Sequence, residues 1–475
     1  MGIQLFNTLT RRMEPFEPLE ANGRKIGMYC CGPTVHDFAH IGNFRTFVLC
    51  DVLRRYLRFR DYEVYHVMNV TDVEDKIIAR VKEAGTSLKA YTQIYEEAFF
   101  KDLEALGCLM PHETPRATDH MDSIIELIER LVAKGIAYSA ADGSVYFSIG
   151  RYQQAGCCYG QLQKLDFDQM RPGERIQSDE YAKDAVADFA LWKARTEADG
   201  EVFWESPWGQ GRPGWHVECS AMSMHYLGNS FDLHLGGEDL KFPHHEDEIA
   251  QSEGAGLQEP GKPFVRHWVH GAHLLVEGKK MSKSLGNFYT LRDLLDKGFD
   301  GRAIRFVLLS AYYRESFNFT LDGLQGAKTA LGRLDECVAK LEAWQKEFDG
   351  EAKPGKSKLI DGFVAAMDDD LNVSAAWAAV FEWVRDINRQ ISQNALSPEN
   401  AAMEYQAWLS VDQVLGLGKD LSQEVIPDDI TQMAIQRQEA RTQKNWAEAD
   451  RLRDELKAAG WTVEDTPEGP RPKRL

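Results

Sequence analysis

The spacing of hydrophobic residues indicates that the first part of the chain alternates between strands and helices. Short apolar runs predict buried strands at residues 25–30 and 63–68, and helical periodicity appears at 41–60, 72–85 and 88–106. Parallel strands need a long crossover connection, which is usually a helix. The alternation therefore predicts right-handed βαβ units around a parallel sheet.

This alternation is interrupted between residues 108 and 214. The interrupting segment contains a predicted helix at 121–134, a hairpin-like stretch at 137–149 and polar loops. The alternation then resumes with a strand at 231–235, a helix at 243–252 and a strand-like run at 265–276. We therefore expect an α/β fold with a Rossmann-type parallel sheet that is split by a connective insertion.

Beyond Tyr289 we expect helices and no further strands until the C-terminal tail. Helical periodicity covers residues 291–297, 303–311, 321–348, 357–366, 373–390 and 402–415. A compact tail follows with helices at 430–443 and 445–459 and a short strand at 463–465. The predicted segments are 1–107 and 215–290 for the two sheet halves, 108–214 for the insertion, 291–350 for helices, 351–420 for an all-α bundle, and 424–475 for a small C-terminal domain.

Composition narrows the function without fixing it. A chain of 475 residues is too long for a single hydrophobic core, so two to four domains are expected. The formal charge of −19 argues against a general nucleic-acid coat protein. An acidic body can still bind RNA through a local basic face, such as the arginines and lysines of the tail, which also fit a solvated helix surface. Eight scattered cysteines and the lack of a ~20-residue apolar run predict a cytoplasmic protein with no membrane span.

The stretch from Met28 to Asn43 has the features of a nucleotide-binding turn. An apolar strand breaks at Gly32-Pro33, and helical spacing begins after Asp37. Backbone N–H groups at a helix start attract phosphate, His40 and Asn43 add donors, and Gly42 permits close approach of a flat base. The same stretch also fits an ordinary strand–turn–helix with a buried histidine.

Lys280 and Lys283 lie on a polar loop that follows an apolar strand. Such a charge run is commonly a solvated turn. Beside a nucleotide-binding turn, however, the two ammonium groups could act as mobile charges on a polyphosphate.

A metal site is suggested by His244 and Glu248, which lie four residues apart and share one helix face. Cys31 and Cys219 are candidates to complete it, because both lie at predicted strand or loop ends. Two thiolates, an imidazole and a carboxylate would form a tetrahedral zinc site. The alternative is a helix with an exposed acidic face and two unrelated buried cysteines.

These motifs resemble those of a known enzyme family. His40-Ile41-Gly42-Asn43 and Lys280-Met281-Ser282-Lys283-Ser284 resemble the two signatures of class I aminoacyl-tRNA synthetases, although the first signature commonly ends in histidine. The wider chain resembles cysteinyl-tRNA synthetases at 5–11, 31–34, 69–72, 115–118, 214–222 and 236–251. The resemblance covers essentially the whole chain.

The resemblance implies an enzyme that activates L-cysteine with ATP and transfers it to the terminal ribose of tRNA(Cys). It implies one zinc ion (Zn2+) per chain, held by Cys31, Cys219, His244 and Glu248, and Mg2+ that accompanies ATP. ATP-binding residues would be Gly32, Thr34, His40, Gly42, Asn43, Gly237, Asp239, Lys280 and Lys283, of which His40, Asn43, Lys280 and Lys283 would be catalytic. Thr71, Trp215, His216 and His234 would bind the cysteine substrate.

The resemblance also assigns roles to the C-terminal segments. Residues 291–350 would contact the tRNA stem and 424–475 would bind the anticodon, in a protein expected to be a monomer. One alternative is the cysteine ligase of the mycothiol pathway, which uses an amino-sugar acceptor and lacks this C-terminal region. Another is a non-catalytic RNA-binding paralogue, which would have eroded signatures. The final residues 469–474 depart from the family's usual aromatic-containing end.

Overall fold

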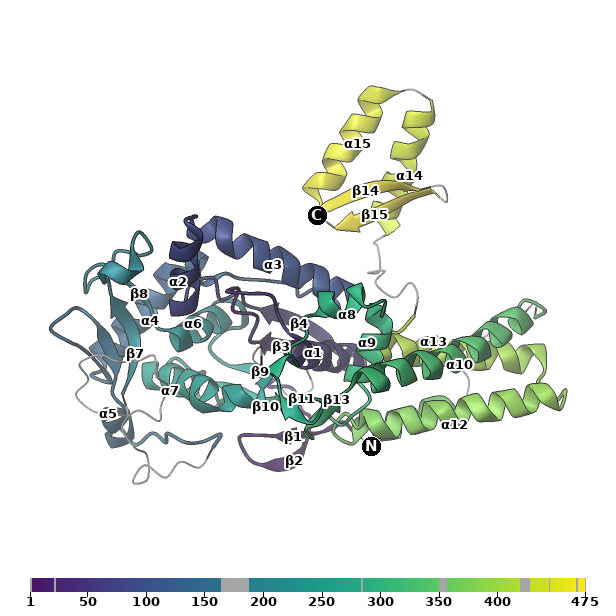
Figure 1. Cartoon of the computed structure of the whole chain (residues 1–475), viewed down its shortest axis with the longest axis horizontal. Coiled ribbons are helices and arrows are strands. Elements are labelled where there is room, and N and C mark those ends of the chain that lie inside the picture. Colours follow the sequence, from purple (N-terminus) through teal and green to yellow (C-terminus); the bar gives the residue numbers. More distant parts are fainter. Residues whose placement is uncertain are drawn as a thin grey trace. The chain divides into compact units, whose positions relative to one another are not determined.

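The computed structural model describes residues 2–20, 23–163, 188–282, 285–348, 350, 357–418, 428–443, 445–466 and 469–474. The chain forms two compact units, Met1–Leu417 and Gly418–Leu475. Figure 1 shows the larger unit with its sheet strands at the centre and long helices from the later part of the sequence.

Four parallel strands form the central sheet in the order β10-β9-β3-β4. They are β3 (Lys25–Cys30), β4 (Glu63–Met68), β9 (Phe231–Gly237) and β10 (Val265–Gly271). Parallel bridges from Val67 to Glu113 and from Val70 to Arg116 extend the sheet beyond β4. Because β3 pairs directly with β9, the two halves on either side of the insertion build one sheet, and the predicted fold class is confirmed.

The two faces of the sheet pack against different parts of the unit. Met28, Cys30 and Leu233 belong to the core that includes α1 (Ile41–Phe59) and the later helices. Tyr29 and Cys31 belong to a core on the other face that includes residues of α6 (Trp215–Leu227) and α7 (Glu246–Ala255). The two-residue side-chain period of a strand thus directs Cys31 toward α6 and α7.

Between the sheet halves lies the insertion, with α4 (Met121–Ala133), α5 (Ile149–Gln154) and an antiparallel sheet. The predicted hairpin is β5 (Ala137–Ser139) and β6 (Val145–Phe147). It is enlarged by β7 (Phe189–Ala194) and β8 (Gly211–Pro213), which the sequence analysis did not predict. Two helices and a 3-10 turn precede α4: α2 (Asp75–Ala84), α3 (Leu88–Ala105) and Ala117–His120.

Three strand predictions need correction. The run 265–276 is two strands, because β10 ends at Gly271 and β11 (Leu274–Val276) joins a second sheet with β12 (Lys279–Lys280) and β13 (Phe317–Phe319). The expectation of no strands between Tyr289 and the C-terminal tail is also wrong, because β13 lies there. It was missed because a strand of three residues is too short to show an alternating pattern. The N-terminal hairpin of β1 (Gln4–Asn7) and β2 (Arg12–Pro15) was not predicted.

The later part of the first unit is helical, as predicted. The segment 291–350 contains α8 (Leu291–Asp296), α9 (Gly301–Leu308) and α10 (Leu321–Gln345), and the predicted all-α bundle of 351–420 contains α11 (Lys358–Asp368), α12 (Val373–Ser392) and α13 (Pro398–Leu415). The second unit contains α14 (Asp428–Thr442), α15 (Trp446–Ala458), β14 (Trp461–Thr466) and β15 (Gly469–Arg474). None of the described helices is both long and apolar enough to cross a membrane.

A buried ion pair joins the sheet half to the bundle. The guanidinium of Arg305 on α9 is fully buried, donates to Asp51 on α1, and also donates to the Leu415 carbonyl at 2.7 Å. Burial would raise the pKa of Asp51, but Arg55 and Arg305 together hold it below its usual value. Asp51 therefore stays ionised and compensates a charge that would otherwise be stranded in the core.

We predict that Asp51→Asn lowers the free energy of unfolding by about 3–5 kcal/mol, because it removes the charge that compensates Arg305. Urea unfolding followed by circular dichroism measures this. The control is Glu336→Gln, which alters the exposed pair with Lys340 and should leave the free energy of unfolding close to the wild-type value. Similar losses in the two variants would contradict the role given to the buried pair.

Candidate functional site

A cavity of about 620 Å³ opens at the carboxyl edge of the parallel sheet. Ligands of open α/β sheets bind at this edge. Most of the predicted ATP-binding residues line the cavity: Gly32, Thr34, His40, Gly42, Asn43, Gly237, Asp239 and Lys280. Cys31 and Trp215 line it as well, so the nucleotide and substrate predictions meet in one cavity. Lys283, the remaining predicted residue, lies outside the described residues.

His40 and Asn43 form a reciprocal cap at the start of α1. The backbone N–H of Asn43 donates to Nδ1 of His40 at 3.2 Å, and the backbone N–H of His40 donates to the side-chain oxygen Oδ1 of Asn43 at 3.1 Å. Burial lowers the pKa of His40, so the ring is neutral and its single N–H is at Nε2. Each side chain therefore has one polar group committed to the cap and an N–H group left for a ligand.

One of the predicted glycines is required by close packing. A Cβ on Gly32 would lie 1.6 Å from the Asn69 carbonyl oxygen, a backbone atom, which is shorter than atoms tolerate. A Cβ on Gly42 would lie 2.7 Å from the terminal methyl group of Met281, a flexible side chain that can move. Gly32 therefore lets two chain segments at the cavity approach one another.

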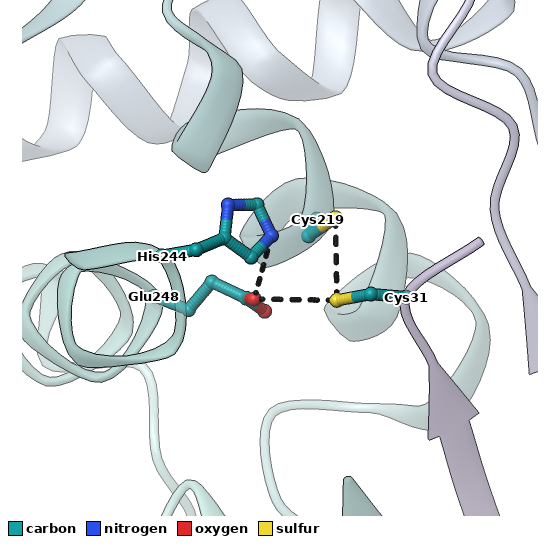
Figure 2. Close-up of side chains that lie close together, drawn as sticks. All are labelled: Cys31, Cys219, His244 and Glu248. Carbon is teal, nitrogen blue, oxygen red and sulfur yellow. Dashed lines mark hydrogen bonds and ion pairs between the residues drawn. The ribbon is translucent and has the colours of Figure 1, made fainter. Parts of the chain in front are cut away.

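The four predicted metal ligands converge (Figure 2), and one of them, Cys31, also lines the cavity. Cys31 follows β3, Cys219 lies on α6, His244 lies in the turn Lys241–His245, and Glu248 lies in the first turn of α7. Their ligand atoms all lie within 4.8 Å of one another, and all four side chains are buried. The predicted helix at 243–252 is thus a short turn followed by α7, yet His244 and Glu248 still face the same point.

The spacing of these atoms fits a tetrahedral zinc site. Zinc bond lengths imply ligand separations of ~3.8 Å for sulfur to sulfur, ~3.6 Å for sulfur to oxygen and ~3.4 Å for nitrogen to oxygen. The Cys31 and Cys219 sulfurs are 4.0 Å apart, and Cys31 Sγ is 3.7 Å from Glu248 Oε1. His244 Nε2 is 3.2 Å from the same oxygen. The residues present therefore fit a borderline-soft divalent cation.

The remaining ring nitrogen of His244 and the remaining oxygen of Glu248 are also held. Nδ1 of His216 lies 2.8 Å from Nδ1 of His244, and Nε2 of His234 lies 2.9 Å from Oε2 of Glu248. Such outer contacts orient metal ligands. His216 and His234 thus contact the metal cluster, and neither belongs to the residues that line the cavity.

The other two predicted substrate residues differ in position. The Trp215 ring lines the cavity and lies 4.5 Å from the His244 ring, so it covers the cluster on the cavity side. Thr71 is buried and does not belong to the cavity lining; its hydroxyl accepts from the Asn69 side chain, and its backbone pairs with the loop that carries Thr34. Thr71 therefore supports the wall of the cavity.

Sequence reasoning missed two histidines of this region. His245 Nε2 is 3.3 Å from Cys31 Sγ, and His245 Nδ1 is 2.7 Å from His270 Nε2. With Cys31, His234 and Glu248, His245 forms a second group of four possible ligands. Its position next to His244 was the available signal, but helical spacing favoured the pair four residues apart.

Burial keeps the two thiols and the His244 imidazole of the cluster uncharged at neutral pH where no cation is bound. Burial raises the pKa of Cys31 well above its usual value. For Cys219 the hydrogen bond with Cys31 lowers the pKa. Burial and the charge of Glu248 raise it by more, so the pKa of Cys219 is above its usual value. Burial lowers the pKa of His244 to about 3. At neutral pH both thiols are protonated and the imidazole is neutral, so a cation must displace two protons.

Comparisons with known proteins assign these parts of the chain. Residues 16–329 match the family model of the tRNA synthetases class I (C) catalytic domain, 362–419 match the DALR domain, and 426–470 match the cysteinyl-tRNA ligase anticodon binding domain. A cysteine–tRNA ligase from Chlamydia muridarum is 48% identical over 487 residues, covering 100% of both chains. One from Protochlamydia amoebophila is 44% identical and covers 99% of this chain and 98% of its own.

Solved structures show the same fold at low identity. The Mycobacterium tuberculosis methionyl-tRNA synthetase in complex with methionyl-adenylate has a TM-score of 0.59 at 17% identity, covering 83% of this chain and 90% of its own. An Agrobacterium radiobacter LeuRS in a ternary complex has a TM-score of 0.60 at 13% identity, covering 86% and 87%.

We predict that the affinity of the cluster for a divalent cation rises about 100-fold per pH unit between pH 6 and pH 8, because two thiol protons leave. His244 adds nothing to this slope, since its pKa of about 3 leaves it unprotonated throughout the range. Chelator competition at several pH values measures the slope. Cys219→Ser should reduce it to about tenfold per unit, and a slope independent of pH would contradict the two-thiol assignment.

Proposed function

The chain belongs to the cysteinyl-tRNA synthetase family and is a cysteine–tRNA ligase, and on that premise we propose that Cys31, Cys219, His244 and Glu248 bind a zinc ion that selects the substrate. The convergence of two thiols, an imidazole and a carboxylate beside the nucleotide cavity carries this proposal. The match of residues 426–470 to the anticodon-binding domain favours tRNA over the amino-sugar acceptor of the mycothiol-pathway ligase.

The substrate chemistry explains why such a site is useful. Cysteine and serine are nearly isosteric, so the shape of a pocket separates them poorly. When bound, zinc supplies a soft Lewis acid that binds a thiolate far better than a hydroxyl. The protein's own part is to hold the four ligands, to orient His244 and Glu248 through His216 and His234, and to cover the site with Trp215. Thr71 acts indirectly, through the cavity wall.

The enzyme activates cysteine by attack of its carboxylate on the α-phosphorus of ATP, which releases pyrophosphate. The terminal ribose hydroxyl of tRNA(Cys) then takes the acyl group and releases AMP. No covalent enzyme intermediate is required, so the residues contribute positioning and charge stabilisation. We assign the N–H groups of His40 Nε2 and Asn43 Nδ2 to the phosphates, because the helix cap leaves both available.

Other residues that line the cavity are proposed to supply the remaining contacts. Asp239 follows β9 and lines the cavity, where its carboxylate can accept from ribose hydroxyls. Lys280 and Lys283 are assigned to the departing pyrophosphate, with Gly32, Thr34, Gly42 and Gly237 forming the backbone of the nucleotide cavity. Mg2+ is proposed to arrive with ATP and to be held chiefly by its phosphates.

Two further proposals concern the working state of the protein. All eight cysteines are free in the structure, as expected in a reducing compartment, and we propose that the protein acts in the cytoplasm. We also propose that it acts as a monomer, which sedimentation of the purified chain would test.

We predict one zinc ion per chain by elemental analysis of the purified protein. Cys31→Ser and Cys219→Ser should each bind zinc more weakly and be purified with less than one zinc ion per chain, and kcat/KM for cysteine in ATP–pyrophosphate exchange should fall at least about 100-fold. Cys337→Ser, at a buried cysteine of α10, should retain both. Activation of cysteine in preference to serine by a zinc-free protein would refute the proposed selection.

For the lysine loop, we predict that Lys280→Ala and Lys283→Ala each lower kcat of the exchange reaction by about 100- to 1,000-fold, because charge on the departing pyrophosphate loses its partner. The KM for cysteine should not change. Lys279→Ala is the matched control, since Lys279 is exposed, neighbours Lys280 on β12 and does not line the cavity. An unchanged kcat in both variants would remove the loop from the mechanism.

A further inference from the structure

A chain of hydrogen bonds runs from the N-terminal hairpin to the metal cluster. Thr8 Oγ1 is 2.9 Å from Nδ1 of His270, and Nε2 of His270 is 2.7 Å from Nδ1 of His245. Nε2 of His245 is in turn 3.3 Å from the sulfur of Cys31. All four side chains are buried, so protein groups rather than bulk water satisfy these atoms.

The hydroxyl end of this chain is fixed by the sheet. The Thr8 amide donates to the Trp268 carbonyl at 2.9 Å. The adjacent Asn7 side chain accepts from the Trp268 amide at 3.2 Å and donates to the Arg266 carbonyl at 2.9 Å. Residues 5–11, which the sequence analysis singled out without a role, therefore anchor Thr8 beside β10.

Hydrogen counting allows only two orders for this chain. A neutral imidazole has one N–H, so each ring donates from one nitrogen and accepts at the other. In the outward order, Thr8 donates to His270, His270 donates to His245, and His245 donates its Nε2–H to Cys31. In the reverse order, both rings carry the proton on Nδ1, and the His245 Nε2 lone pair faces the cluster as a potential ligand.

The two orders correspond to the two possible ligand groups. The reverse order suits the group of Cys31, His234, His245 and Glu248, which leaves the Cys219 sulfur without a cation although it is buried 4.0 Å from that of Cys31. The outward order suits the group that uses both thiols and His244. Since a soft cation favours two thiolates over one, the outward order is the consistent choice.

We propose that Thr8 and His270 are positioning residues that hold His245 with its Nε2–H directed at the sulfur of Cys31. The consequence for the cation rests on the proposed zinc site. An N–H bond to the Cys31 sulfur favours its thiolate over its thiol, and the thiolate is the form that binds a cation and keeps it in place for the substrate thiol. Loss of an outer contact of this kind costs about 10- to 100-fold in metal affinity or activity.

The direct test is the protonation of the two rings. In the full-length protein as purified, labelled with 15N-histidine, the nitrogen shifts of His245 and His270 distinguish Nε2–H from Nδ1–H. Protonation of both rings at Nε2 is the expected result, and protonation at Nδ1 overturns the proposal. This measurement needs no variant and is separate from elemental analysis, so a wrong ring protonation and a lack of zinc are distinguishable outcomes.

The functional test uses Thr8→Val, which replaces the hydroxyl with a methyl group of similar size. In the cobalt-loaded full-length protein we expect a shifted thiolate-to-cobalt absorption band and a 10- to 100-fold weaker hold on cobalt against a chelator. The KM for cysteine should rise while the KM for ATP stays unchanged. Thr8→Ser should restore the wild-type values, because it restores the hydroxyl.

Thr92→Val is the matched control, because Thr92 is also buried and its hydroxyl donates within α3, to the Leu88 carbonyl. It should leave the cobalt band and both KM values unchanged. Wild-type values in Thr8→Val would overturn the positioning role. An equal loss in Thr92→Val would also overturn it, since the effect would then be general destabilisation.

Discussion

The site depends on the pairing of β3 with β9, two strands that the insertion separates in sequence. The hydrogen bond from the Cys31 amide to the Leu235 carbonyl, at 3.2 Å, ends this pairing at the edge of the sheet. It places the Cys31 sulfur 3.7 Å from Glu248, a residue 217 positions away in the chain. A slip of one residue would turn every side chain of β3 to the opposite face, and Cys31 would then point toward α1.

The end of β9 also leaves space for one of the surrounding histidines, because its residue there is a glycine. A Cβ on Gly236, at the end of β9, would lie 2.5 Å from the His245 ring, so the ring occupies space that any other residue would fill. Imidazoles packed this closely are tolerated because nearly every ring nitrogen has a partner, and burial lowers the pKa of His244, His245 and His270 so that these three rings are neutral. The proposed cation-binding cluster is thus built as a buried polar core, in which His216 and His234 orient His244 and Glu248.

Local sequence patterns predicted the parts of this arrangement that depend on near neighbours. Apolar runs located β3 and β9, and the four-residue spacing identified His244 and Glu248. Contacts between distant segments left no such pattern. β13 is a three-residue strand that pairs with β11, and the positions of His216 and His234 behind the ligands depend on how α6 and β9 pack. His245 was missed for the same reason. The four-residue spacing identified its neighbour His244, whereas its hydrogen-bond partner His270 lies on another element of the fold and is not indicated by local spacing.

The reciprocal cap between His40 and Asn43 determines the state of the active site before any substrate arrives. Because the start of α1 consumes one nitrogen of the ring, the imidazole has a single tautomer, and its outward group is always a donor. In the proposed complex with ATP, the triphosphate meets an N–H donor that is already in place, and no proton has to move first. The backbone N–H of residue 43 holds this tautomer, so the helix start fixes it whether the side chain there is asparagine or histidine.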